Sequence, residues 1–270
     1  MSKPFYNKAR KGEHKSRGAQ TDKFRDMEGP VWLYGYHACE AALKNSKRRI
    51  RKASITKNMA DRLQAESVVL PNGWTEVRPR DLDGLVERDS VHQGIVLEVD
   101  PLDQPTLEEV RNHDLVVVLD QVTDPHNVGA IMRSACALGA GAVVTTLRHA
   151  PHETGLLAKT ASGAFELVPY IQVTNLARAV EEMQALQFLA IGLDSEGPMD
   201  LIETTSRQAA SKIALVLGAE GRGLRRLTRD LCDELARLDM PGPIKSLNVS
   251  NAAALSLFIC RQSLNERAPD

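Results

Sequence analysis

Met240-Pro-Gly-Pro-Ile-Lys-Ser-Leu-Asn-Val-Ser-Asn-Ala-Ala-Ala-Leu255 joins two kinds of sequence. Its first half is rich in proline and glycine and predicts an irregular loop. Its second half is apolar and rich in alanine and predicts a helix. Side-chain oxygens of Ser246, Asn248 and Ser250 lie at the junction, where they can cap free N–H groups of the first helical turn. A loop that feeds a helix N-terminus can hold a polar ligand, although a well-capped core helix explains the same pattern.

Length, composition, net charge and cysteine spacing disfavour several classes of protein. The length of 270 residues allows one or two domains, and 43% hydrophobic residues suit a sizeable core. Aromatic residues at 4% disfavour extensive base stacking, and a net charge of −1 gives no global nucleic-acid signature. The cysteines form no C-x-x-C pair, which disfavours a zinc ribbon and fits a reducing cytoplasm; they are Cys39, Cys136, Cys232 and Cys260. No apolar run approaches the roughly 20 residues that span a bilayer, and the N-terminus lacks a secretory signal. We therefore expect a cytoplasmic protein outside the membrane.

Two segments concentrate positive charge. Residues 1–29 carry eight basic and four acidic side chains with few aliphatic ones, which predicts a disordered basic arm. A second run has no acidic residue and contains Lys44, Lys47, Arg48, Arg49, Arg51, Lys52 and Lys57. Either segment can add electrostatic affinity for an RNA backbone. A solubilising tail remains an equal explanation for the arm, and a solvated helix end is the alternative for the second run, for which we favour RNA contact.

Residues 30–100 predict a small α/β domain. Strand patterns occupy residues 54–56, 75–78 and, most clearly, 94–99. Helical patterns occupy residues 35–43 and 61–66. Residues 101–113 contain two prolines and a short helical turn that Thr106 can cap, and they predict a linker.

From Leu115 onward, apolar β-prone runs alternate with helical patterns. The predicted strands are residues 115–119, 142–146, 189–193 and 213–217, with a further short candidate at 236–239. The predicted helices are residues 128–138, 153–162, 175–187 and 223–233. Continuous apolar strands are typical of a parallel sheet with both faces covered, so the pattern predicts a doubly wound α/β domain. Ligands in such sheets bind at loops that leave the carboxyl ends of strands.

Two more loops follow predicted strands. In Asp120–Arg133, Asp124-Pro-His-Asn127 has turn chemistry, and Asn127 can cap the next helix. Arg133 then suits a phosphoryl partner, or it pairs with an internal carboxylate. In Gly218-Ala-Glu-Gly-Arg-Gly-Leu224 the glycines permit close backbone approach to a ligand, and Glu220 could pair with Arg133. This loop lacks the G-x-G-x-x-G spacing and a Walker lysine, which disfavours a nucleotide-binding dehydrogenase.

Together the three loops resemble the signature motifs of the SpoU, or TrmH, family of S-adenosylmethionine-dependent RNA 2′-O-ribose methyltransferases. The matching stretches, in order, are residues 127–135, 217–224 and 240–254. Gly35-Tyr-His-Ala-Cys-Glu-Ala and His92-Gln-Gly-Ile-Val resemble the start and end of an L30e-like RNA-binding domain found in a subgroup. The resemblance covers about residues 31–264.

The resemblance implies an α/β fold with two domains. The C-terminal one, residues 114–266, would be a SPOUT domain with a parallel sheet and a trefoil knot, and the smaller N-terminal one would be L30e-like. It also implies a homodimer with the site near the interface, S-adenosyl-L-methionine as cofactor, and no metal. The expected reaction methylates a ribose 2′-hydroxyl in RNA, with a guanosine of large-subunit ribosomal RNA favoured over tRNA. A catalytically silent RNA-binding or ribosome-assembly protein is the alternative from another class.

The resemblance also assigns roles to residues. Arg133 would hold the ribose oxygen or the adjacent phosphate and stabilise developing negative charge, since a guanidinium pKa above about 12 makes a poor base. Asn127 and Glu220 would position Arg133, and Ser246 and Asn248 would shape the substrate and cofactor site. Backbone around Gly218, Leu238 and Leu247 would hold the cofactor. The motifs do not name the group that accepts the hydroxyl proton.

Overall fold

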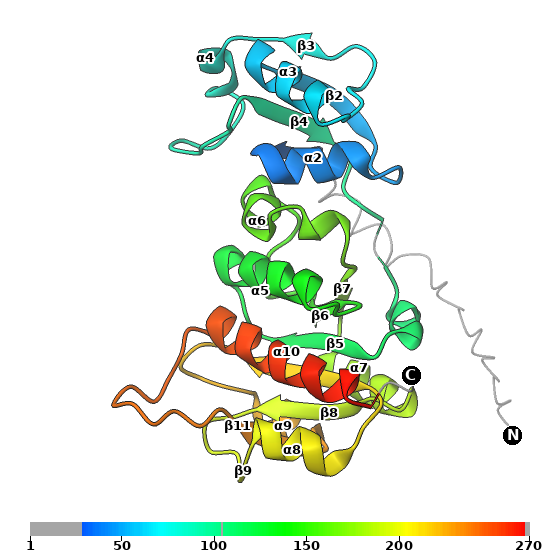
Figure 1. The fold of residues 1–270 in the computed structure, drawn as a ribbon, viewed down its shortest axis with the longest axis vertical. Coiled ribbons are helices and arrows are strands. Elements are labelled where there is room, and N and C mark those ends of the chain that lie inside the picture. The colour runs from blue at the N-terminus through cyan, green and yellow to red at the C-terminus, as the bar shows by residue number, and fades with distance from the viewer. Residues whose placement is uncertain (1–28, 104, 268–270) are drawn as a thin grey trace, which may run out of the picture.

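The computed structural model describes residues 29–103 and 105–267. The predicted basic arm, residues 1–29, therefore lies outside the described residues except for Gly29. The described chain forms a small sheet and then a larger one, stacked along the long axis of the molecule (Figure 1).

The small sheet has the order β1-β4-β2-β3. Its strands are β1 (Val31–Tyr34), β2 (Ile50–Ile55), β3 (Thr75–Glu76) and β4 (Ile95–Val99). The central β4 pairs antiparallel with β1 and β2, and β2 pairs parallel with β3. Helices α2 (Tyr36–Lys44), α3 (Lys57–Ala65) and α4 (Pro79–Leu82) complete this α/β unit. Strand β1 was not predicted, and α3 begins four residues before the predicted helix at 61–66.

The larger sheet has the order β7-β6-β5-β10-β8-β11-β9, and every pair in it is parallel. Its strands are β5 (Leu115–Asp120), β6 (Val143–Thr146), β7 (Tyr170–Val173), β8 (Leu189–Leu193), β9 (Met199–Asp200), β10 (Ile213–Gly218) and β11 (Glu234–Arg237). All six residues of β5 are buried, as a central strand covered on both faces requires. The predicted parallel α/β architecture is confirmed.

Helices cover both faces of this sheet. One face packs against α5 (Pro125–Ala137), α6 (Gly155–Ala161), α8 (Leu201–Gln208) and α10 (Val249–Asn265). The other packs against α7 (Leu176–Ala185) and α9 (Arg226–Leu231). The short 3₁₀ helices are η2 (Leu107–Asn112) and η3 (Ala164–Glu166). Helix α8 was not predicted because three consecutive hydroxyl residues, 204–206, weaken its helical pattern.

Strand β11 lies between β8 and β9, which are consecutive in the chain. The connection at 194–198 must therefore cross β11, and a Cβ on Gly197 would lie 2.7 Å from the Ala236 carbonyl carbon. After β11, residues 238–248 carry the chain to α10, on the face opposite α9. A strand that lies beneath the connection between two other strands is compatible with a knotted domain. The passage of the C-terminal segment through a loop, which would make the knot, stays a prediction.

The expected patch of seven free basic side chains is wrong in part. Arg48 is buried and bonds to Glu166, and Arg49 and Arg51 pair with Asp100. Lys44 pairs with Glu40 of its own helix. Tertiary contacts thus bring acidic partners to a run that has none in its sequence. Three of the seven remain exposed with no acidic partner among the described residues; they are Lys47, Lys52 and Lys57.

Candidate active site

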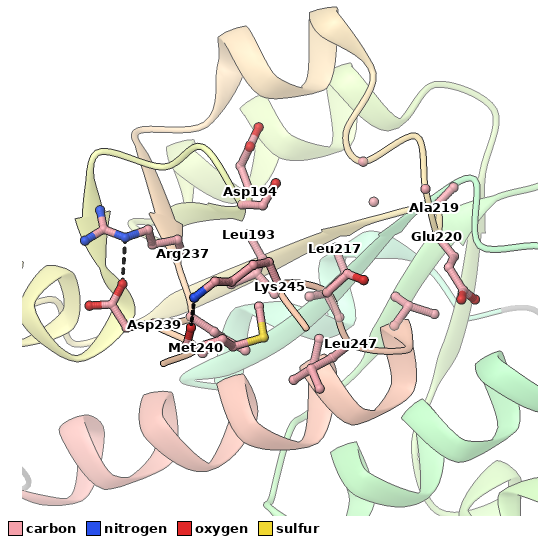
Figure 2. Close-up of a pocket in the computed structure, with 18 residues that line it drawn as sticks. Leu193, Asp194, Leu217, Ala219, Glu220, Arg237, Asp239, Met240, Lys245 and Leu247 are labelled. Carbon is pink, nitrogen blue, oxygen red and sulfur yellow. Dashed lines mark hydrogen bonds and ion pairs between the residues drawn. The ribbon is translucent and has the colours of Figure 1, made fainter. Parts of the chain in front are cut away.

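A cavity of about 560 Å³ opens at the carboxyl ends of β8, β10 and β11 (Figure 2). Its walls are the loop after β10 and the segment between β11 and α10, which are the second and third motifs. Leucine and valine side chains supply much of the apolar lining: Leu193, Leu217, Leu238, Leu247 and Val249. The three residues expected to hold the cofactor, Gly218, Leu238 and Leu247, all line this cavity.

Charged side chains surround the apolar lining. Arg237 Nε lies 2.7 Å from Asp239 Oδ1, so these two charges offset each other. Asp194 pairs with Arg229 at 2.9 Å. Lys245 Nζ donates to the Met240 carbonyl at 2.6 Å, and among the described residues it has no acidic partner. Glu220 and Arg237 lie on opposite sides of the cavity in Figure 2. The cavity therefore combines apolar surface with one cation that remains available to a ligand.

The loop after β10 folds tightly back on its strand. Ala219 and Gly223 exchange backbone hydrogen bonds, with N···O distances of 3.1 and 2.8 Å. A Cβ on Gly218 would lie 2.1 Å from the carbonyl carbon of Gly223, which leaves no room for any other residue. Gly221 and Gly223 have positive φ values, a conformation that favours glycine. The turn carries Glu220, whose side chain is exposed beside the cavity.

The helix that begins the third motif is capped as expected. Asn248 Oδ1 accepts from Ser250 N at 2.9 Å and from Ser250 Oγ at 2.6 Å. Its Nδ2 donates to Asn127 Oδ1 at 3.0 Å, which joins the first motif to the third. The expectation that Asn127 caps α5 is wrong, because Asp124 is the cap and accepts from His126 N at 3.0 Å. Pro125 occupies the first helical position, so Asn127 lies within the first turn and bonds to Asn248 instead.

Arg133 lies away from these groups. Its side chain is exposed on α5, and it does not line the cavity. Within the described residues it forms neither the predicted pair with Glu220 nor a pair with an internal carboxylate. Arg133 is six residues beyond Asn127, which corresponds to about 9 Å along a helix axis. One chain therefore brings Glu220 and Ser246 to the cavity and joins Asn127 to Asn248, but it leaves Arg133 apart.

A buried contact between Asp120 and Arg225, which no motif predicts, supports the site. The Asp120 side chain, fully buried at the end of β5, accepts from Arg225 N at 3.0 Å and from Arg225 Nε at 2.6 Å. This contact holds the loop after β10 against the neighbouring strand. The signal was an acidic residue directly after an apolar strand, where a side chain without a partner would be costly.

Two family models match the chain. The SpoU rRNA Methylase family matches residues 114–258, and the RNA 2′-O ribose methyltransferase substrate binding family matches residues 32–105. A 23S rRNA (guanosine-2'-O-)-methyltransferase, RlmB, from Pseudomonas putida is 37% identical over 84% of this chain and 94% of its own length. The protein of that name from Haemophilus ducreyi is 39% identical over 86% of this chain and 98% of its own.

Solved structures share the fold. The SpoU methyltransferase AviRb from Streptomyces viridochromogenes, in complex with AdoMet, matches with a TM-score of 0.74 and 22% identity, over 94% of this chain and 95% of the other. Among the described residues no helix is long and apolar enough to cross a membrane. That part of the chain also contains no group of three or more acidic, histidine or cysteine residues that could hold a metal ion. By its sequence and its fold, the chain belongs to the SpoU rRNA methylase family.

Proposed function

We propose that this chain transfers a methyl group from S-adenosyl-L-methionine to the ribose 2′-hydroxyl of a guanosine in 23S ribosomal RNA. The observation that carries the proposal is the cavity formed by the second and third motifs, joined to the first motif through Asn127 and Asn248. A volume of about 560 Å³ is within the usual range for cofactor pockets. The relatives named for this reaction match almost the whole described chain.

The lining of the cavity fits the proposed cofactor. Gly218 brings the backbone of β10 close to the cavity without a side chain, and Leu238 and Leu247 supply apolar contacts for a heterocyclic ring. The Lys245 ammonium, which has no acidic partner in the described chain, suits the carboxylate of an amino-acid moiety. When bound, S-adenosylmethionine supplies an electrophilic methyl group on its sulfonium.

Arg133 supplies positive charge for the reaction. A ribose hydroxyl is a weak nucleophile, and negative charge develops on its oxygen as the methyl group is transferred. A guanidinium that no described carboxylate neutralises can hold this oxygen or the adjacent phosphate and stabilise that charge. We propose that Ser246 and the Asn127–Asn248 pair shape the surface on which the nucleotide rests.

We also propose that the chain forms a homodimer through α5 and α10. These helices pack together, and α10 exposes Leu255 and Phe258 to solvent at 51% and 53%. The exposed Arg133 is on the same helix pair, so a second copy can complete a site that one chain leaves open. The alanines at 252–254 take little part, since Ala253 is buried in its own core and Ala252 lines the cavity. We place the protein in the cytoplasm, where its RNA substrate is found.

Phe258→Asp is expected to make the protein monomeric and to reduce methyl transfer by at least tenfold, because a carboxylate would be desolvated at the proposed interface. Sedimentation velocity measures the mass. Leu227→Asp is the control, since Leu227 is also an exposed apolar residue but lies on α9, across the sheet. An unchanged mass for Phe258→Asp would contradict this interface.

The test of the function is transfer of a radiolabelled methyl group to purified RNA that lacks the modification. We expect incorporation into 23S ribosomal RNA, and mapping of the product should place it on one guanosine ribose. Incorporation only into tRNA would replace the proposed substrate with the tRNA alternative. Cofactor binding without incorporation into any RNA would favour the silent RNA-binding protein.

A further inference from the structure

A cluster of three charged side chains is buried between the two sheets. Arg48 comes from the loop before β2, Glu153 from the loop before α6, and Glu166 from η3. Their side chains are 0%, 8% and 2% exposed, respectively. Charged groups are almost never buried this deeply unless they are paired, so the contacts within the cluster decide what it does.

The Arg48 guanidinium has contacts in three directions: hydrogen bonds to Glu166 and to the Asp100 carbonyl, and an ion pair with Glu153. Its Nη2 and Nε lie 2.6 and 3.0 Å from Glu166 Oε1. Its Nη1 lies 2.6 Å from Glu153 Oε1 and donates to the Asp100 carbonyl at 2.8 Å. Arg48, itself in the small domain, therefore joins the last residue before the linker to the larger domain through one rigid, planar group.

Two neighbouring contacts extend this network. Asn45 Nδ2 donates to Glu166 Oε2 at 2.7 Å, and the Leu102 amide donates to Glu153 Oε2 at 3.0 Å. Both carboxylates thus use their second oxygen to bind either the small domain or the linker. The segment after Asp100 is consequently fastened at its start and does not act as a free tether.

The backbones also approach closely around this cluster. A Cβ on Gly155 of α6 would lie 2.2 Å from the Trp32 carbonyl oxygen of β1. Ala158 of α6 is buried within the core of the small domain. In Figure 1, α6 lies between α2 and α5, and it contacts both of them. Helix α6 is therefore shared by the two domains.

Burying these charges is costly. Desolvation raises the pKa of the Glu153 carboxyl above its usual range, although the charge of Arg48 opposes the shift. Apolar side chains of similar volume would often give equal or greater stability, so a buried ionic cluster is weak evidence for stabilisation. The ionic cluster differs from apolar packing in that it restricts orientation. Two apolar surfaces can slide over each other, whereas a guanidinium between two carboxylates permits few orientations of the parts that it joins.

We propose that Arg48 is a positioning residue that fixes the angle between the small domain and the methyl-transfer cavity. With the angle fixed, the nucleotide that reaches the cavity is determined by its distance from the RNA held by the small domain. The cluster then acts in the choice of the methylated nucleotide, without touching RNA or cofactor. This inference rests on the proposed function, and on the small domain as the part that holds RNA.

The test compares Arg48→Met with Arg49→Met. Arg49 is adjacent in sequence, but its side chain is 83% exposed and its contact with Asp100 is long, at 3.5 Å. For Arg48→Met we expect cofactor affinity within twofold of the unsubstituted chain by calorimetry. We expect methylation of the target nucleotide to fall at least tenfold, with methyl groups appearing at neighbouring riboses. Arg49→Met should keep both the rate and the position of methylation.

Gly155→Ala tests the same joint without altering any charge. Its new methyl group would push α6 away from Trp32 and change the angle, so we expect the same redistribution of methyl groups with cofactor affinity retained. A role in stability alone would lower the melting temperature but would leave the methyl group on the same nucleotide.

Methylation confined to the original nucleotide in folded Arg48→Met, or in Gly155→Ala if Arg48→Met does not fold, would overturn the inference. Failure of the proposed function looks different, because the unsubstituted chain itself would then place no methyl group on ribosomal RNA.

Discussion

We expect Arg133→Ala to remove nearly all methyl transfer while leaving S-adenosylmethionine binding within a few-fold of the unsubstituted chain. Losing a group that stabilises developing negative charge typically costs about 100- to 1,000-fold in rate. Arg133 lies outside the cavity, so its removal should not disturb the cofactor. Arg133 is also exposed and has no bonded partner among the described residues. Its substitution should therefore change the free energy of unfolding by less than about 0.5 kcal/mol. Single-turnover transfer and calorimetric cofactor binding are the two measurements.

Arg207→Ala is the matched control for this prediction. Arg207 is likewise exposed on a helix, α8, and forms no ion pair with a described residue. It should leave both the rate and the affinity unchanged. Arg133→Lys should recover only part of the rate, since lysine keeps the charge but loses the planar fork of donors. Loss of cofactor binding in Arg133→Ala, without a separate defect in transfer, would remove Arg133 from the reaction centre.

The sequence predicts the larger sheet well because its strands are almost continuously apolar. Residues 115–119 and 213–217 have this pattern and form β5 and β10, two adjacent central strands. Strand β7 was missed because it is a short edge strand whose sequence, Tyr170-Ile-Gln-Val, breaks the apolar run. Central strands are therefore visible in the sequence, while edge strands depend on neighbours that no local pattern reveals.

The functional loops were identifiable for a different reason. Glycines at 218, 221 and 223 and polar side chains at 246, 248 and 250 are unusual for core elements, so the sequence alone indicates a site there. The partners of single side chains were not predictable. Arg48 was assigned to an RNA-binding patch because its acidic partners, Glu153 and Glu166, follow more than 100 residues later. Charge runs in a sequence therefore overestimate free surface charge wherever domains meet.

The separation of Arg133 from the cavity has a consequence for catalysis. The cavity proposed to hold the cofactor is formed within one chain, by the loops after β10 and β11. Presenting the guanidinium to the ribose depends on the proposed second copy or on the bound RNA. Variants should therefore lose cofactor binding and methyl transfer independently. Substitution of Gly218 should impair cofactor binding, whereas substitution of Arg133 should impair methyl transfer with the cofactor still bound.

We expect Gly218→Ala to abolish S-adenosylmethionine binding, with at least a hundredfold rise in Kd, and to lower stability by about 1–3 kcal/mol. The added methyl group would lie 2.1 Å from the Gly223 carbonyl carbon and 2.4 Å from the Leu224 nitrogen. These are backbone atoms that no rotamer change can move. The turn that carries Glu220 must therefore shift, and it forms one wall of the cavity. Calorimetric titration and thermal unfolding measure the two effects.

Gly242→Ala is the control in the facing segment. A Cβ at Gly242 meets nothing within 4 Å, so this variant should bind the cofactor as the unsubstituted chain does. The comparison separates a general sensitivity of the glycine-rich segments from the close approach at the end of β10. Cofactor binding by folded Gly218→Ala at the original affinity would mean that the turn can move without opening the cavity. The tight contact of Gly218 with Gly223 would then have a role in folding only, and the cofactor would have to depend on the Leu238 and Leu247 side of the cavity.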